Sequence, residues 1–214
     1  MSTLDHSQGL SFIEKRALIR RKLQRSLTEW TAPLSHGQRA LWFLHQVSPD
    51  SAAYNLPFAV RVRSKFDFET FRSAMQVLVD RHAALRTTFG EKNGEPIQVI
   101  HAKREIDLAR VDASHLSEEE LRSLVSHEAH RPMDPETGPL FRGVVFSRSD
   151  DDHVLLFVMH HIIGDFWSLV VMMSDLQKIF PHRIAQGLPP AMVEYDDYVN
   201  WQKTYLEGSD GDRL

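Results

Sequence analysis

The 214-residue sequence contains no cysteine, which excludes disulfide bonds, thiolate nucleophiles and thiolate metal sites. It has no apolar run long enough to cross a membrane as a helix, and its start lacks the continuous apolar core of a secretory signal. Neither sign of charge dominates, since the chain has 25 basic and 29 acidic residues. The overall charge therefore gives no positive electrostatic field of the kind that indicates nucleic-acid binding. We therefore expect a cytoplasmic protein that spans no membrane and binds no nucleic acid.

The motifs of several enzyme classes are also missing. The sequence has neither a Gly-x-Ser-x-Gly nucleophile elbow nor a glycine-rich loop for binding phosphates. His127 and His130 lie three residues apart around Glu128, which differs from the His-Glu-x-x-His zinc motif. We therefore expect no metal site, and direct transfer chemistry is favoured over a covalent intermediate on the enzyme.

What is present is the composition of a globular domain, with 42% hydrophobic and 25% charged residues. Residues 11–27 combine dense positive charge with apolar residues, which predicts a basic amphipathic helix within an N-terminal linker or docking segment, residues 1–31. This role is favoured over membrane binding. Proline resists helix, so Trp30 to Pro33 is interpreted as a boundary, and the main domain is expected over residues 32–214.

Beyond this boundary the sequence alternates strand and helix signals, which is typical of an α/β domain. Val60 and Val62 alternate with arginines, as in a half-buried strand, and Asn93-Gly94 is a strong hairpin signal. Ser117 and Glu120 form a capping box that starts a helix. The expected strands lie at 55–63, 85–89, 96–101, 140–147 and 153–161, and the expected helices lie at 67–82 and from 117 onward.

The most informative segment is an apolar strand that ends in two histidines. Residues 154–159 are apolar at every position, which predicts a strand buried on both faces. His160 and His161 follow on opposite faces, because side chains alternate along a strand. Apolar residues at helical spacing then run from Leu169 to Phe180. An imidazole at such a turn suits general-base catalysis near neutral pH, and a buried histidine that only satisfies a backbone carbonyl is the alternative.

Five motifs occur in an order found in one known family. His160, His161 and Asp165 match a His-His-x-x-x-Asp-Gly core. The other blocks are Ser35–Leu44 (Ser-x-x-Gln-x-x-Leu-Trp-x-Leu), Arg81–Phe89 (Arg-His-x-x-Leu-Arg-Thr-x-Phe), Gly138–Arg142 (Gly-Pro-Leu-x-Arg) and Tyr195–Trp201 (Tyr-x-Asp-Tyr-x-x-Trp). Several motifs in register are strong evidence where one would be weak. From about residue 32 to residue 202, the sequence resembles the condensation domains of nonribosomal peptide synthetases.

The resemblance implies a chloramphenicol acetyltransferase-like α/β fold with a mixed sheet flanked by helices. A complete member has two similar lobes that meet at a V-shaped cleft, and all the motifs matched here belong to its front half. A chain of 214 residues has room for one such lobe. We therefore expect residues 32–214 to form an N-terminal lobe whose C-terminal lobe is absent, and we expect this half to be inactive in isolation.

The resemblance also implies an acyltransferase that makes amide (peptide) bonds in nonribosomal peptide or hybrid polyketide biosynthesis. Its partners would be acyl or peptidyl carrier proteins, whose phosphopantetheinyl arms deliver both substrates, together with the missing lobe and neighbouring synthetase domains. No other cofactor is implied. Two alternatives stay open: a non-catalytic lobe that docks carrier proteins, and an ester-forming acyltransferase of the same fold.

For the individual residues, His161 is the candidate base, or the group that positions the amine and stabilises charge, and His160 is its neighbour in the catalytic motif. The resemblance implies that Asp165 is structural and forms an ion pair with Arg81 or Arg86. Breaking one side of such a partly buried pair costs about 3 to 5 kcal/mol.

One position departs from the family, because Phe166 replaces the glycine that follows the aspartate. Phenylalanine removes backbone freedom and adds bulk beside the loop, so a specialised acyl substrate and reduced activity are both open. We expect Gly164, Phe166, Trp167 and Ser168 to line the substrate channel. Trp42, Phe43 and Trp167 are otherwise expected to pack in the core rather than to bind a cofactor.

Overall fold

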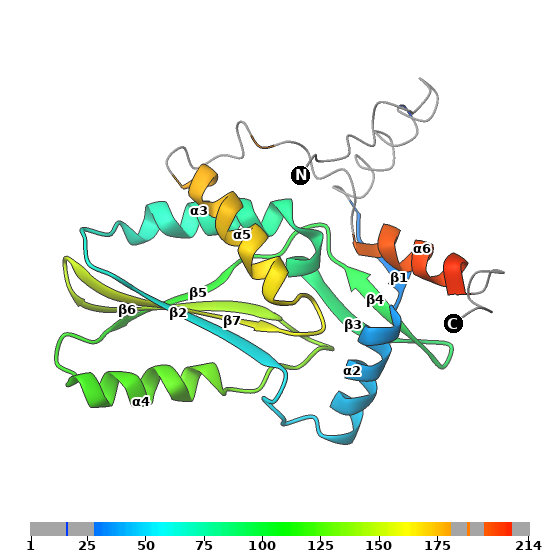
Figure 1. Cartoon of the computed structure of the whole chain (residues 1–214), viewed down its shortest axis with the longest axis horizontal. Helices are drawn as coiled ribbons and strands as arrows, with labels where there is room; N and C mark the ends of the chain where they lie inside the picture. Colours follow the sequence, from blue (N-terminus) through cyan, green and yellow to red (C-terminus); the bar gives the residue numbers. More distant parts are fainter. Residues whose placement is uncertain (1–15, 17–27, 181–187, 189–194, 207–214) are drawn as a thin grey trace.

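The computed structural model describes residue 16, residues 28–180, residue 188 and residues 195–206. Except for Arg16, the basic helix predicted at residues 11–27 lies outside the described residues. Two β-sheets stand next to each other, and helices pack around them (Figure 1). In the described part of the chain, no helix is both long and apolar enough to cross a membrane.

A four-stranded mixed sheet forms the larger part of the described structure. Its strands are β2 (Asn55–Val62), β5 (Asp107–Asp112), β6 (Phe141–Ser149) and β7 (Asp152–His160). The strand order is β2-β7-β6-β5, with β5 parallel to β6 and the other neighbours antiparallel. Helices α3 (Phe68–Arg81) and α5 (Phe166–Ile179) cover one face, and α4 (Glu118–Ala129) covers the other (Figure 1). The predicted mixed sheet flanked by helices is confirmed.

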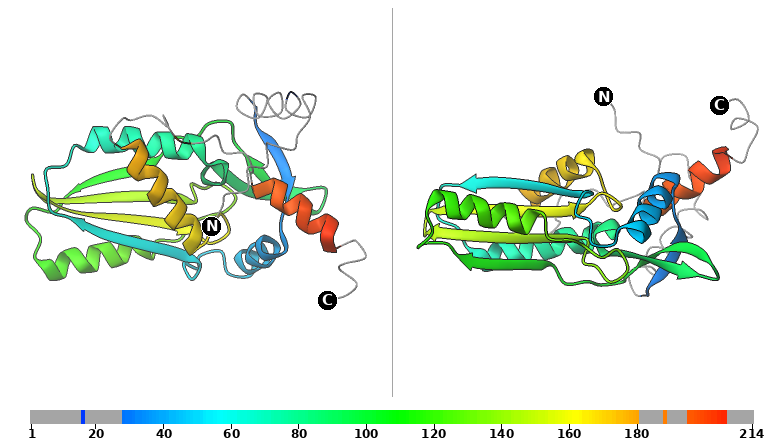
Figure 2. Two further views of the ribbon diagram at one scale, coloured as in Figure 1. Left: turned by 45° about the horizontal axis from the view of Figure 1, so that its top comes forward. Right: turned by 90° about the horizontal axis from the view of Figure 1, so that it is seen from below.

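A three-stranded antiparallel sheet stands at one end of the larger sheet (Figure 2). It contains β1 (Trp30–Pro33), β3 (Thr87–Lys92) and β4 (Glu95–Ile100), in the order β1-β4-β3, and the short helix η1 (Ala83–Arg86) leads into β3. Helices α2 (His36–Val47) and α6 (Tyr195–Leu206) lie on this side of the molecule (Figure 2). Residues 30 and 31, which the sequence assigned to the linker, belong to β1. Pro33 is tolerated there because β1 is an edge strand.

The two central strands carry the hydrophobic core. Every residue of β7 from Leu155 to His160 is buried, and so is every residue of β6 from Phe141 to Ser147. Met75 and Leu78 of α3 are completely buried against them. Helices cover both faces of these strands, and residues 154–159 of β7 are apolar without alternation, as predicted.

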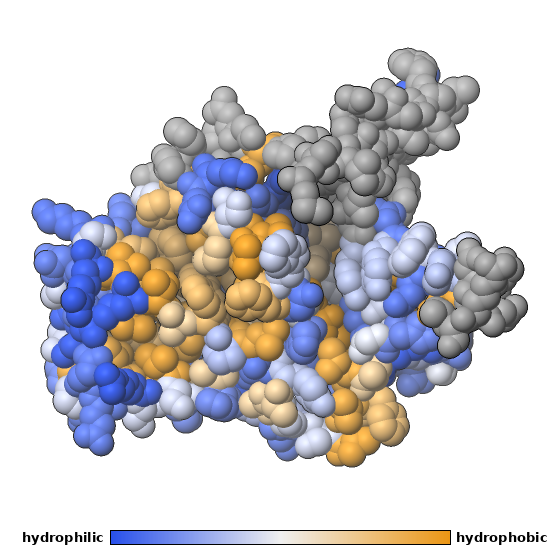
Figure 3. All heavy atoms as spheres, in the orientation of Figure 1, coloured by the Kyte–Doolittle hydropathy of each residue, from blue (hydrophilic) through white to orange (hydrophobic). Residues whose placement is uncertain are grey.

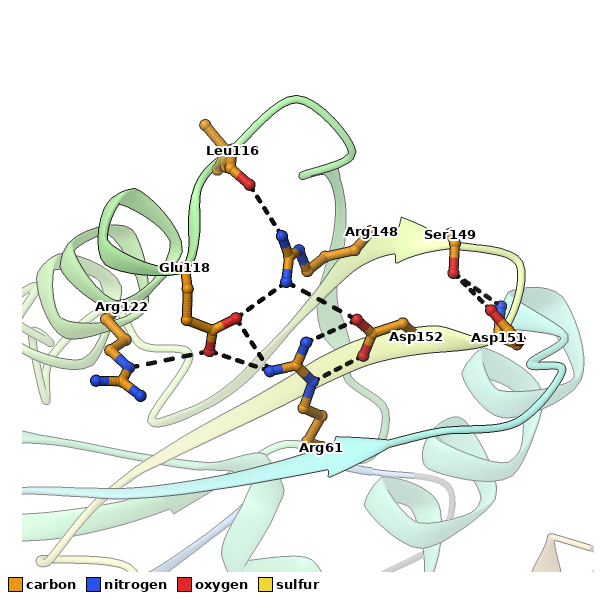
Figure 4. A network of polar contacts seen from close by, with 8 residues as sticks. All are labelled: Arg61, Leu116, Glu118, Arg122, Arg148, Ser149, Asp151 and Asp152. Atoms are coloured by element: carbon orange, nitrogen blue, oxygen red, sulfur yellow. Dashed lines mark hydrogen bonds and ion pairs between the residues drawn. The ribbon is translucent and has the colours of Figure 1, made fainter.

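The first turn of α4 is fixed to the sheet by a network of ion pairs (Figure 4). The Arg61 guanidinium donates to Asp152 through Nε and Nη2, both at 2.7 Å, and its Nη1 lies 3.0 Å from Glu118 Oε1. Arg148 Nη1 donates to Glu118 Oε2 at 2.9 Å. The network therefore joins α4 to β2 and to the β6–β7 turn, at the end of β7 opposite His160.

Two buried side chains of the sheet cap the other end of α4. Asn55 Nδ2 donates to the carbonyls of Ala129 (3.1 Å) and Arg131 (2.9 Å). Arg142 Nη2 donates to the carbonyls of Glu128 (2.8 Å) and Arg131 (2.6 Å), and burial lowers the pKa of Arg142 to about 10. These bonds satisfy carbonyls that a helix end leaves without partners. The Gly-Pro-Leu-x-Arg motif thus contributes a helix cap, a role that the sequence did not specify.

Candidate functional site

His161 is the first residue after β7 and begins the turn into α5. Its backbone N–H donates to Tyr54 O at 2.8 Å, its side chain is exposed, and its Nδ1 lies 2.9 Å from Gly164 O. Because a carbonyl oxygen can only accept, Nδ1 carries the proton of the neutral ring. The Nε2 atom is therefore left with a free lone pair, which is the form that a general base requires.

His160 has the opposite environment. Its side chain is only 3% exposed, and its Nδ1 accepts the N–H of Ile162 at 3.1 Å. Burial, reinforced by the neighbouring His45 and His161, lowers the pKa of His160 to about 4, so the ring is neutral near pH 7. Of the two neighbouring histidines, His160 is thus buried and His161 is accessible from solvent.

The backbone of the turn is anchored behind His161. Ile162 and Ile163 are buried, with 2% and 8% of their surface exposed, and the N–H of Ile163 donates to His160 O at 3.1 Å. On the opposite side, Gln38 Nε2 donates to Ile162 O at 3.1 Å. In the sequence, Gln38 stands out only as the glutamine of the Ser35–Leu44 motif, which does not predict its contact with this turn.

Asp165 is the N-cap of α5. Its Oδ1 accepts from both the backbone N–H and the hydroxyl of Ser168, each at 2.8 Å, and its own N–H donates to Ser168 Oγ at 3.2 Å. The bond from the Ser168 N–H is the main reason why the pKa of Asp165 is lowered. The hydroxyl of Ser168 is therefore occupied by this cap.

The prediction that Asp165 forms an ion pair with Arg81 or Arg86 is wrong. Among the described residues, neither arginine contacts Asp165. Arg81 Nε instead binds Asp175 Oδ2 at 2.8 Å, and His82 Nε2 donates to the same oxygen at 3.0 Å. Burial lowers the pKa of His82. The reason is geometric: Asp165 lies at the exposed start of α5, where helix N–H groups satisfy it, whereas Asp175 lies on the buried face of α5 that packs on α3.

Arg86 is buried, and backbone oxygens accept its hydrogen bonds. Its Nε donates to Val79 O at 3.2 Å, and its Nη1 donates to Ala102 O at 3.1 Å and to His101 O. Arg86 thus joins the end of α3 to the segment after β4. This explains why the second motif contains an arginine that does not reach the histidine turn.

The aromatic residues after Asp165 lie on the surface. Phe166 and Trp167 are 73% and 71% exposed, and Phe43 is 65% exposed, so the expected core packing of Phe43 and Trp167 is wrong. Trp42 is buried as expected. A Cβ atom on Gly164 would approach Ser168 Cβ and the Met159 side chain to 3.0 Å, so a larger residue there would require these neighbours to shift. That Gly164, Phe166, Trp167 and Ser168 line a substrate channel stays a prediction.

Three other motifs meet behind the histidine turn. Their residues line a small cavity of about 20 Å³ together with Ile163. Tyr195 of the last motif is hydrogen-bonded through its hydroxyl to Ser35 Oγ, 2.9 Å away, which fastens α6 to the start of α2. The cavity is lined by Gln38, Ala83, Ala84, Thr87, Gln98, Ile100, Ile163, Tyr195 and Asp196. Among the described residues, no group of three or more His, Asp or Glu side chains is placed to hold a metal ion.

The fold that carries this turn is that of a condensation domain. The starter condensation domain of rhizomide synthetase RzmA superposes with a TM-score of 0.74 at 17% identity, over 86% of this chain and 46% of the other. The X-domain of teicoplanin biosynthesis, solved in complex with OxyB, gives a TM-score of 0.75 at 28% identity, over 85% of this chain and 39% of the other. The likeness is one of fold and extends over most of this chain.

Sequence comparison gives the family itself. The condensation-domain family model matches residues 28–213, and the chain therefore belongs to the condensation-domain family. It is 38% identical to a linear gramicidin synthase protein of Brevibacillus parabrevis over 82% of this chain, and 38% identical to surfactin synthase subunit 1 of Bacillus subtilis over 83%. The chain spans only 2% and 5% of those two synthases.

Proposed function

We propose that this chain is the histidine-bearing lobe of a condensation domain that joins an acyl thioester on one carrier protein to an amine on another. The observation that carries the proposal is the free Nε2 of His161, held at an exposed turn by the 2.9 Å contact between Nδ1 and Gly164 O. Family membership supports carrier proteins as partners, within a cytoplasmic synthetase. The phosphopantetheinyl arms of the carriers deliver both substrates, and no further cofactor takes part.

In this mechanism His161 Nε2 accepts a hydrogen bond from the incoming amine and aligns its lone pair with the thioester carbonyl. The amine nitrogen attacks the carbonyl carbon, and Nε2 receives the proton that the nitrogen loses. The tetrahedral intermediate collapses, the C–S bond breaks, and the proton passes to the leaving thiolate. One amide and one free thiol result. Gly164 O stabilises the transient imidazolium through the proton on Nδ1.

The residues that follow Asp165 border the same site. Phe166 and Trp167 expose large apolar rings within six residues of His161. Aromatic surface next to a base favours contact with an acyl chain or with the methylene groups of a pantetheine arm. A side chain at Gly164 would meet Met159 and Ser168, and Ser168 holds the loop through the cap on Asp165.

The test uses His161→Ala in a condensation domain made from this chain and a second lobe. We expect product formation from acyl and aminoacyl carrier proteins to fall by about 10²- to 10⁴-fold in a single-turnover assay read by intact mass spectrometry. The unfolding temperature should change little, because the side chain is exposed. His127→Ala is the matched control, since His127 is an exposed histidine on α4. Wild-type product formation by His161→Ala would refute the proposal.

A further inference from the structure

We infer that Gln38 is a positioning residue for His161, because its buried amide holds the backbone of the histidine turn. This inference rests on the proposed function, in which the orientation of His161 matters. Gln38 lies on α2, 124 positions before Ile162 in the sequence, yet its Nε2 donates to Ile162 O at 3.1 Å. Its side chain is buried, with 4% of its surface exposed.

One half of the Gln38 amide has a local task. Its Oε1 accepts the backbone N–H of Ser35 at 3.0 Å, and the backbone N–H of Gln38 donates to Ser35 Oγ at 3.2 Å, which makes a capping box at the start of α2. Glutamate would serve equally well in such a box, because only an acceptor is required. Capping therefore does not explain why an amide is present.

The other half of the amide has two donors, and both are used. Besides the bond to Ile162 O, Nε2 donates to Gln98 Oε1 at 3.2 Å. Gln98 is 3% exposed, and its own Nε2 donates to Pro33 O at 2.8 Å, which fixes its oxygen toward Gln38. A relay of three hydrogen bonds thus runs from Pro33 in β1, through Gln98 and Gln38, to the turn. In a buried setting of low dielectric constant these hydrogen bonds are stronger than they would be in water.

The turn depends on this relay because His161 has few contacts of its own. Its ring is oriented by Gly164 O, two residues after Ile162, and its backbone is held by Tyr54 O. If the carbonyl of Ile162 loses its donor, the peptide units up to Gly164 can rotate toward another partner. Gly164 O then moves away from Nδ1, and the ring loses its fixed tautomer.

The deciding variant is Gln38→Glu, which keeps the acceptor for Ser35 and removes both donors. The matched control is Gln76→Glu. Gln76 Oε1 likewise accepts a backbone N–H, that of Ile106 at 2.9 Å, and its Nε2 donates to Arg104 O and to Asp80 Oδ1, both at 2.9 Å. The control therefore makes the same replacement of an amide by a carboxylate on α3, at a half-buried position with no partner in the histidine turn.

The first measurement is the ¹⁵N spectrum of the His161 ring in the 214-residue chain above neutral pH. The unchanged chain and Gln76→Glu should show one tautomer, with the proton on Nδ1, whereas Gln38→Glu should show a mixture that includes protonated Nε2. The second measurement is single-turnover condensation in the two-lobed protein. There Gln38→Glu should lower the rate by about 10- to 100-fold with little change in KM, because a misplaced base slows the chemical step rather than binding.

Should Gln38→Glu fail to fold, Gln98→Met tests the same relay, since it leaves the capping box intact and removes the acceptor that orients Gln38. A wild-type tautomer and a wild-type rate in these variants overturn the inference. Equal losses in Gln38→Glu and Gln76→Glu also overturn it, because they indicate general instability. An active His161→Ala variant would refute the proposed function while the tautomer shift still supports the positioning role, so the two failures are distinguishable.

Discussion

Two adjacent histidines in this protein have opposite environments, and His160 should make the stability of the fold depend on pH. The pKa of His160 is about 4 in the folded chain against 6.5 for an exposed histidine. Between these values the unfolded chain binds the proton and the folded chain does not. The contribution of His160 to the free energy of unfolding is therefore complete above pH 6.5. It falls as the pH decreases toward 4, by roughly 3 kcal/mol in total.

The measurement is urea denaturation at several pH values for the unchanged chain and for His160→Asn, whose amide can still accept from Ile162 but does not titrate. The variant should be less stable at pH 7 and should lose less stability on acidification from pH 6.5 to 4. His82 titrates in both proteins and cancels from the comparison. Equal loss of stability in the two proteins would show that His160 is not the titrating group.

At the same scale, Asp165 should contribute to stability as a helix cap rather than as half of an ion pair. Among the described residues, the donor to its carboxylate is Ser168 in the first turn of α5. Asp165→Ala should therefore cost about 1 kcal/mol, and Asp165→Ser should restore most of it because serine is also a good N-cap. A double-mutant cycle with Arg81→Ala should show no coupling. A coupling energy well above 1 kcal/mol would instead support the ion pair that the family resemblance implied.

Between elements, the ion pair that the structure does show joins α3 to α5. The side chains of Arg81 and Asp175 are only 15% and 11% exposed, and His82 binds the same carboxylate. Removing one partner should cost about 3 kcal/mol, since the other charge stays buried. Arg81→Ala and Asp175→Asn should be strongly coupled in chemical denaturation, whereas Arg72→Ala, an exposed arginine of the same helix, should be neutral. Additivity within about 0.5 kcal/mol would contradict this assignment.

Elements whose signals are local were predictable from the sequence. The Asn93-Gly94 hairpin has positive φ at both residues, 55° and 81°, as a two-residue turn of this kind requires. The capping box at Ser117 and Glu120 is present, and β6 and β7 lie close to the strands expected at residues 140–147 and 153–161. Family motifs added the position of the site, because they identified the histidines before any contact was known.

Elements that depend on distant partners were missed or misjudged. The strand expected from residue 85 starts only at Thr87, because residues 83–86 form η1. Arg86 in η1 binds the carbonyl of Val79 before it in the sequence and that of Ala102 after it. β5 was missed, since it is held by parallel pairing with β6. β2 was predicted to be half-buried, but Pro57 to Val60 are exposed because the strand is an edge of its sheet. Contacts spanning 60 and 124 residues, such as those of Gln38, leave no periodic trace in a sequence.

At the scale of the whole molecule, the described chain leaves much apolar surface exposed. Figure 3 shows this surface gathered between α3 and α4, around β2 and α5. Its exposed members include Phe58 and Val60 of β2 and Phe166, Trp167 and Val170 of α5. Apolar surface beside an unpaired strand edge is typical of a site that another chain segment covers. A second lobe is the partner that the proposed function requires.

This surface leads to the expectation that the 214-residue chain folds, self-associates and does not condense substrates by itself. His161 is open to solvent on one side, and an amine must be both aligned and shielded from water for transfer to compete with hydrolysis of the thioester. Sedimentation velocity should show association that increases with concentration. Intact mass spectrometry of acyl and aminoacyl carrier proteins mixed with the chain should show no amide product. Robust product formation by a strictly monomeric chain would show that a single lobe suffices and that the two-lobed mechanism is wrong.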